Sequence, residues 1–169
     1  MCGRFITRDQ AATEREFSVV LPLWSYSPHF NITLTSRLEP NVPAIHVVDR
    51  QRVGRMMRWP LIRASLHGTP PPFSTFNAAA EGLTTKSTWR SIWNNRDPDR
   101  PIRRCILPAG GFYEWQWNGE EGVASVVQPY FIRPIDQDIY GFAGLWGISV
   151  RPPGWHRNLR VLDRDDHRQ

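Results

Sequence analysis

The stretch RCILPAGGFYEWQW at residues 104–117 decides the fold that this sequence predicts. Residues 104–108 and 111–117 are rich in aliphatic and aromatic side chains, which are enriched in β-strands. Ala109 and Gly110 separate the two runs and suit a break between two strands. Alternation along the second run places Phe112, Glu114 and Gln116 on one face and Tyr113, Trp115 and Trp117 on the other.

Further strand-like runs lie on both sides of this stretch. They occupy residues 44–49, 53–59, 130–132 and 139–145. Residues 49–52 predict a turn between the first two runs, and four prolines within residues 60–76 predict a long surface loop. We therefore expect a β-rich α+β domain over residues 2–150, with mainly antiparallel strands and a few short helices.

Two segments predict the short helices. Thr7 and Gln10 fit a capping box at the start of a helix that continues to about Val19, before Pro22. Ser87 is expected to cap the second helix. The side chains expected to face the core are Ala12, Phe17 and Val20 in the first helix and Trp89, Ile92 and Trp93 in the second.

Composition limits the class of protein. The chain has 169 residues, is 40% hydrophobic and has a formal net charge of +5, which suits one soluble, cytoplasmic domain. No apolar run is long enough for a membrane span, and two cysteines are too few for a disulfide scaffold. All but one of the 21 lysine and arginine residues are arginines. Guanidinium groups bind phosphate oxygens well, but an excess of arginine over lysine is also typical of a GC-rich genome. Zinc-ligand clusters, phosphate-binding glycine loops and nucleotide-cofactor fingerprints are not found, so we expect no metal and no cofactor.

Cys2 is the residue with the most distinctive chemistry. Removal of Met1 would give Cys2 a free α-amine and a free thiol on adjacent carbons. An amine with a pKa near neutrality can condense with an aldehyde, and the thiolate can then close a thiazolidine ring. By itself, a cysteine at this position is more often incidental.

Four motifs give Cys2 a context. They are MCGRF at residues 1–5, FNAAAE at 76–81, RCILPAGGFYEW at 104–115 and GFAGLW at 141–146. In this order they resemble the SOS response-associated peptidase (SRAP) family. The resemblance implies a protein that binds single-stranded DNA and crosslinks through Cys2 to the ring-opened aldehyde of an abasic site, or a bacterial autopeptidase that acts through the same cysteine.

The resemblance also assigns roles around Cys2. Glu114 would assist proton transfer at the Cys2 amine, and Asn77 would position the terminal residue and the open sugar. Without the motifs, Glu114 would be a solvated strand carboxylate and Asn77 a turn residue. Asn31 is expected to be structural, and Cys105 is expected to be a buried small hydrophobe.

Three residues are assigned to DNA binding. Arg4 is a candidate for a phosphate beside the lesion, and Arg90 is assigned to the same surface. Trp59 could offer a stacking surface, with Leu61 and Ile62 as a wedge, although a tryptophan in a strand more often packs in the core. The expected partner is single-stranded DNA with abasic sites, bound by a monomer without a membrane.

The chain departs from the family pattern in three places. Ala79 stands where the family has an arginine, and Leu34 stands near an expected proline. The family's histidine motif is not found, because neither His156 nor His167 has its neighbours. We therefore expect a truncation or frame change after about residue 150 and a charged, poorly ordered tail at 151–169, without helix or strand.

Three functions stay open from the sequence. The first is an abasic-site crosslinking protein with Cys2, Asn77 and Glu114 as its catalytic residues. The second is a thiol peptidase with Cys2 as its nucleophile, which lacks a recognisable histidine base. The third is an inert remnant that binds DNA through its arginines.

Overall fold

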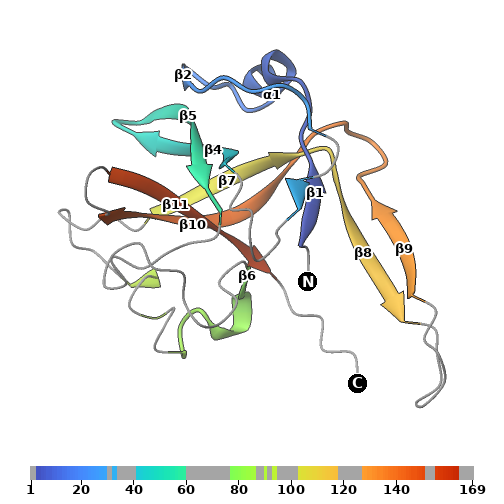
Figure 1. The fold of residues 1–169 in the computed structure, drawn as a ribbon. Helices are drawn as coiled ribbons and strands as arrows, with labels where there is room; N and C mark the ends of the chain where they lie inside the picture. Colours follow the sequence, from blue (N-terminus) through green and yellow to red (C-terminus); the bar gives the residue numbers. More distant parts are fainter. Residues whose placement is uncertain are drawn as a thin grey trace.

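Two sheets contain the strands of the described part of the chain (Figure 1). The computed structural model describes residues 3–29, 32–33, 41–59, 77–86, 90, 93–94, 103–117, 127–150 and 155–163. The four-stranded sheet has the order β3 (Ile32–Thr33), β1 (Arg4–Ile6), β8 (Gly111–Trp117) and β9 (Val127–Ile132). The seven-stranded sheet has the order β2 (Leu21–Leu23), β5 (Gln51–Arg58), β4 (Asn41–Val48), β7 (Arg103–Ala109), β10 (Tyr140–Val150), β11 (Trp155–Asp163) and β6 (Asn77–Ala79).

Most strand pairs are antiparallel. The parallel pairs join β2 to β5, β11 to β6 and, at one position, β11 to β5. The helices bounded within the described residues are short: α1 (Gln10–Glu16) and the 3₁₀ turn η2 (Ala80–Gly82). The β-rich α+β class predicted from the sequence is confirmed.

The two runs of the 104–117 stretch belong to different sheets. β7 lies inside the seven-stranded sheet and β8 inside the four-stranded one. At the corner between them, the Gly110 amide donates to the Ile6 carbonyl at 3.0 Å. A Cβ atom at Gly110 would lie 2.4 Å from Nε of Arg8, so a larger residue there would require the Arg8 side chain to move.

β4 and β5 form the expected hairpin. Its turn is tighter than predicted, because Val48 already pairs with Gln51. Asp49 and Arg50 have φ angles of 47° and 64°, as a two-residue type I′ turn requires. The predicted strand pair is therefore confirmed, with two turn residues in place of four.

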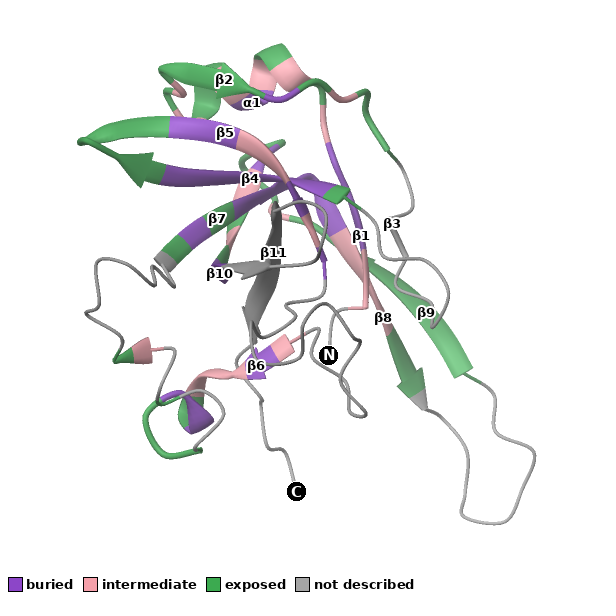
Figure 2. Cartoon of the chain, turned by 60° about the vertical axis from the view of Figure 1, so that its left-hand side comes forward, coloured by how far each residue is buried: buried purple, intermediate pink, exposed green. Residues whose placement is uncertain are grey.

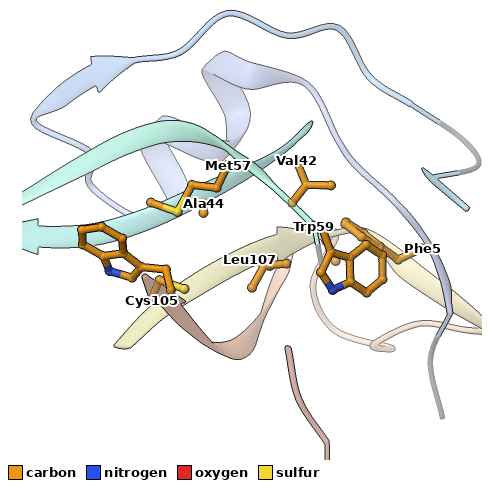
Figure 3. Packing of buried hydrophobic residues seen from close by; sticks show 9 residues of the cluster. Phe5, Val42, Ala44, Met57, Trp59, Cys105 and Leu107 are labelled. Carbon is orange, nitrogen blue, oxygen red and sulfur yellow. The ribbon is translucent and has the colours of Figure 1, made fainter. Parts of the chain in front are cut away.

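Most of the core cluster comes from the strands of the seven-stranded sheet, and Phe5 joins it from the four-stranded sheet (Figure 3). Phe5 comes from β1, and its ring packs edge to face on Trp59 at 5.5 Å between centroids. Cys105 is 6% exposed in the same cluster, and burial raises the pKa of its thiol. The prediction that Cys105 is a buried small hydrophobe is confirmed. The full cluster is Phe5, Val42, Ala44, Met57, Trp59, Cys105, Leu107, Ala109 and Trp146.

The first helix starts later and ends earlier than predicted. Its N-cap is Asp9, whose carboxylate accepts from the Ala12 amide at 2.9 Å. Thr7 is instead buried, and its hydroxyl accepts from the His29 amide. Val20 is 62% exposed, so its predicted inward position is wrong.

The second predicted helix is only partly described. The Arg90 amide donates to the Lys86 carbonyl and the Asn94 amide to the Arg90 carbonyl, which is the helical spacing. Trp93 is half-buried, with the guanidinium of Arg104 4.3 Å from its ring centroid. The predicted cap and the other two core residues, Ser87, Trp89 and Ile92, lie outside the described residues, as does the 60–76 loop.

The C-terminal segment contains a strand that the sequence did not predict. β11 pairs with β10 from Gly144↔Val161 to Val150↔Trp155 and with β6 on its other side. The structure therefore differs from the expected tail without regular structure over residues 155–163. Backbone pairing forms this strand, so a charged sequence can adopt it without an apolar alternation.

Candidate functional site

The pairing of β1 with β8 positions the start of the chain. Phe5 lies opposite Phe112 and Ile6 opposite Gly111 in an antiparallel register. If this register continued two residues beyond its last pair, Gly3, which precedes β1, would lie opposite Glu114. Cys2 lies outside the described residues, but it is covalently bonded to Gly3.

Glu114 lies between the core and the solvent. It is half-buried and shares a face of β8 with Phe112, whose ring packs 5.6 Å from Phe142. On β9, Tyr130 is its direct cross-strand partner and is 46% exposed. The half-buried carboxylate is thus flanked by Phe112 and Tyr130, and a carboxylate is a group that can transfer protons.

Asn77 comes from the other sheet. It opens β6, pairs with Val161 of β11 and is half-buried, with its Oδ1 oxygen shielded from solvent. Figures 1 and 2 both show β6 on the side of the molecule towards which the start of β1 points. The fold therefore pairs β1 with the strand that contains Glu114, and β6, which begins with Asn77, lies on the same side of the molecule in the seven-stranded sheet.

The predicted DNA-binding residues have different surroundings. The guanidinium of Arg4 lies 5.0 Å from the ring centroid of Trp115, which is 42% exposed. Arg90 is exposed. Trp59 is completely buried against Phe5, so in this structure its ring is not exposed for stacking with bases.

An exposed aromatic residue beside the site was missed from the sequence. Phe131 on β9 lies opposite Tyr113, with 5.0 Å between ring centroids, and is 43% exposed. The predicted strand at residues 130–132 included Phe131, but no pattern in that run distinguishes it from Tyr130 and Ile132.

A shallow hollow of about 330 Å³ lies away from these residues. Its lining is Thr7, Arg8, Asp9, Ala12, Pro28, Asp138 and Ile139, and it includes none of the predicted site residues. Within the described ranges, no group of three or more His, Cys, Asp or Glu side chains could hold a metal. No helix in this part of the chain is long and apolar enough to cross a membrane.

Proteins similar in sequence to this chain include several named abasic site processing protein. Abasic site processing protein YoqW of Bacillus subtilis is 27% identical over 159 residues, which cover 91% of this chain and 63% of YoqW. Abasic site processing protein HMCES of Pongo abelii is 30% identical over 184 residues, which cover 96% of this chain and 49% of HMCES. The chain thus spans less than two thirds of the length of these relatives.

Solved structures share the fold. A protein from Bacteroides thetaiotaomicron aligns with a TM-score of 0.68 at 17% identity, covering 95% of this chain and 67% of that one. A phage-related protein of Bordetella bronchiseptica aligns with a TM-score of 0.65 at 22% identity, covering 97% of this chain and 70% of that one.

The family described as SOS response associated peptidase (SRAP) matches residues 1–165. The match includes the start of the chain, the strands that hold Asn77 and Glu114, and β11. Because it covers nearly the whole sequence, this chain belongs to the SRAP family.

Proposed function

We propose that this protein processes abasic sites in single-stranded DNA by forming a covalent thiazolidine between Cys2 and the lesion aldehyde. The names of the relatives support a role at abasic sites. The observation that supports the proposal is the pairing of β1 with β8, which lays the strand that begins two residues after Cys2 alongside the strand that contains Glu114. A terminal amine and thiol would thereby be near a carboxylate able to move protons.

The proposed reaction starts once Met1 has been removed. The Cys2 amine adds to the aldehyde carbon of the ring-opened sugar, and loss of one water gives an imine. The Cys2 sulfur then forms a bond to the same carbon, and the thiol proton ends on the ring nitrogen. Overall the reaction consumes the aldehyde and releases one water molecule, with no oxidant or metal in the balance.

Glu114 and Asn77 would assist this reaction in different ways. The Glu114 carboxylate would move the proton between the amine and the departing oxygen. The Asn77 amide can both donate and accept hydrogen bonds, which suits it to hold the open sugar. Arg4 would pair with a neighbouring phosphate and fix the register of the strand.

The direct test is the intact mass of the protein after incubation with an oligonucleotide that contains one abasic site. We expect a heat-stable adduct whose mass equals that of the protein without Met1 plus that of the oligonucleotide, minus one water. Cys2→Ala should abolish it, and so should an N-terminal extension that blocks the amine.

The matched control is Cys105→Ala, since that thiol is buried in the core and its loss should leave the adduct intact. An adduct that survives Cys2→Ala would contradict the proposal. DNA binding without any adduct would indicate the inert remnant, and Cys2-dependent cleavage of an extended precursor would indicate the peptidase.

A further inference from the structure

The outer face of the four-stranded sheet has an exposed aromatic surface. Tyr113 and Trp115 of β8 and Phe131 of β9 lie on the face opposite Phe112, and we call these three residues the aromatic platform. Trp115 and Phe131 are 42% and 43% exposed. Figure 1 shows β8 and β9 projecting away from the seven-stranded sheet, and Figure 2 shows β9 exposed along its length.

The rings of the platform are held in place by their neighbours. Tyr113 and Phe131 pack with 5.0 Å between centroids and 43° between planes. A Cβ atom at Gly111 would lie 2.3 Å from Cζ of Phe131, so that ring rests directly on the glycine. Arg4 approaches Trp115 to 5.0 Å. Fixed rings lose little side-chain entropy when a flat ligand stacks on them.

Strand addition does not explain this surface. β9 is an edge of the four-stranded sheet, but Pro129 in its middle has no N–H to offer an added strand. A proline is one of the means by which edge strands avoid pairing with other chains. The exposed rings therefore need a ligand that uses their faces and not the strand's backbone.

The charge of this face indicates what that ligand is. Arg4 lies beside Trp115, and the exposed Arg133 directly follows β9. The residues described on this face of β1, β8 and β9 include no carboxylate, because Glu114 is on the opposite face of β8. Aromatic rings beside guanidinium groups match the stacked bases and phosphates of a single strand.

We propose that the aromatic platform binds bases of the single-stranded DNA that runs away from the lesion, with Arg4 between the platform and the site. Arg4 connects the two because it lies two residues after Cys2 and contacts Trp115. This inference rests on the proposed function and specifies the path of its substrate. The partner is a DNA strand bound without base specificity, since every base has a face that can stack.

The test measures affinity for an intact single-stranded oligonucleotide, which has no abasic site and cannot crosslink. We expect Phe131→Leu and Trp115→Leu each to weaken binding by about tenfold, since leucine keeps apolar bulk but removes the ring. Trp115→Phe should restore most of the affinity. The matched control is Leu23→Ala on the β2 edge, with a similar exposed fraction of 45%, which should bind as the wild type does. A thermal unfolding midpoint for each variant shows that it is folded.

A second readout locates the contact. Oligonucleotides with one 5-iodouracil at successive positions from the abasic site are irradiated, and the attached peptide is identified by mass spectrometry. We expect attachment to the peptide around Trp115 or Phe131 at one or two positions only.

The outcomes separate the two proposals. Unchanged affinity in both leucine variants, or attachment only to other peptides, overturns the platform while leaving the Cys2 reaction intact. Ring-dependent binding without any adduct at abasic DNA supports the platform and overturns the proposed reaction. No binding of single-stranded DNA by the wild type overturns the platform as well.

Discussion

At the scale of single residues, Glu114 is the group whose role depends most on its surroundings. It is half-buried, shares its face with Phe112 and lies opposite Tyr130. The sequence predicted its strand and its face from alternation alone, because side chains in a strand alternate strictly between the two sides. Its cross-strand partner Tyr130 could not be predicted, since pairing between β8 and β9 depends on register.

We predict that Glu114→Gln slows adduct formation by about 10²- to 10⁴-fold, the usual effect of losing one proton-transfer group. The adduct should still form, because Cys2 supplies both bonding atoms. The measurement is the single-turnover rate at saturating abasic DNA, from mildly acidic to mildly alkaline pH. Gln116→Ala, two residues along the same face, is the control and should react at the wild-type rate. Equal rates for Glu114→Gln and wild type at every pH would contradict the role.

Cys105 provides a second test at this scale. Burial raises the pKa of its thiol, so the folded protein keeps the proton at a pH where the unfolded chain loses it. The unfolded state then binds fewer protons, and stability should fall by up to about 1.4 kcal/mol for each pH unit above about 8.5. Urea unfolding of wild type and Cys105→Ala across this range should show the slope only in the wild type, apart from what other groups contribute to both. Parallel pH profiles would show that Cys105 is not protected by the fold.

At the scale of elements, the sequence predicted strands better than helix ends. The β4–β5 hairpin was recognisable because its apolar runs flank a polar turn. The start of α1 was placed at Thr7, whereas Asp9 is the cap, since both residues are common N-caps. Thr7 instead makes two hydrogen bonds to the backbone of His29: its amide donates to the His29 carbonyl, and its hydroxyl accepts from the His29 amide. Pro22, predicted to stop the helix, lies in β2 several residues after the helix has ended.

At this scale we predict that β11 stabilises the seven-stranded sheet. It pairs with β10 over seven positions and also with β6, which holds Asn77. Deleting residues 151–169 should therefore expose the edge of β10, lower the unfolding midpoint strongly and increase binding of a hydrophobic dye. Deleting only residues 164–169 is the control and should change the midpoint much less. Equal midpoints for the two deletions would show that β11 does not stabilise the sheet.

At the scale of the whole molecule, the division into two sheets determines where the candidate site residues lie. The chain crosses from β7 in one sheet to β8 in the other through Gly110. Phe5 of β1 packs on Trp59, which directly follows β5 of the seven-stranded sheet. β1 thereby lies next to the strand that contains Glu114, while Asn77 belongs to the other sheet. Trp59, which we expected to contact DNA, is buried against Phe5. The rings of Trp115 on β8 and Phe131 on β9 are exposed to solvent.

The sequence by itself determined the β-rich class, the β4–β5 hairpin, the family and the residue types available for chemistry, because alternation, turn residues and short motifs are local signals. Only the tertiary structure decided which strands pair, and so which side chains are neighbours and which are buried. The alternation of side chains along a strand predicts that Tyr113 and Trp115 share a face. It does not predict that Phe131 and Arg4 lie next to them on that face. It also cannot reveal β11, whose charged segment is a strand because β10 and β6 offer it backbone partners on both sides. Contacts between residues far apart in the chain depend on register and packing, and no local pattern encodes them.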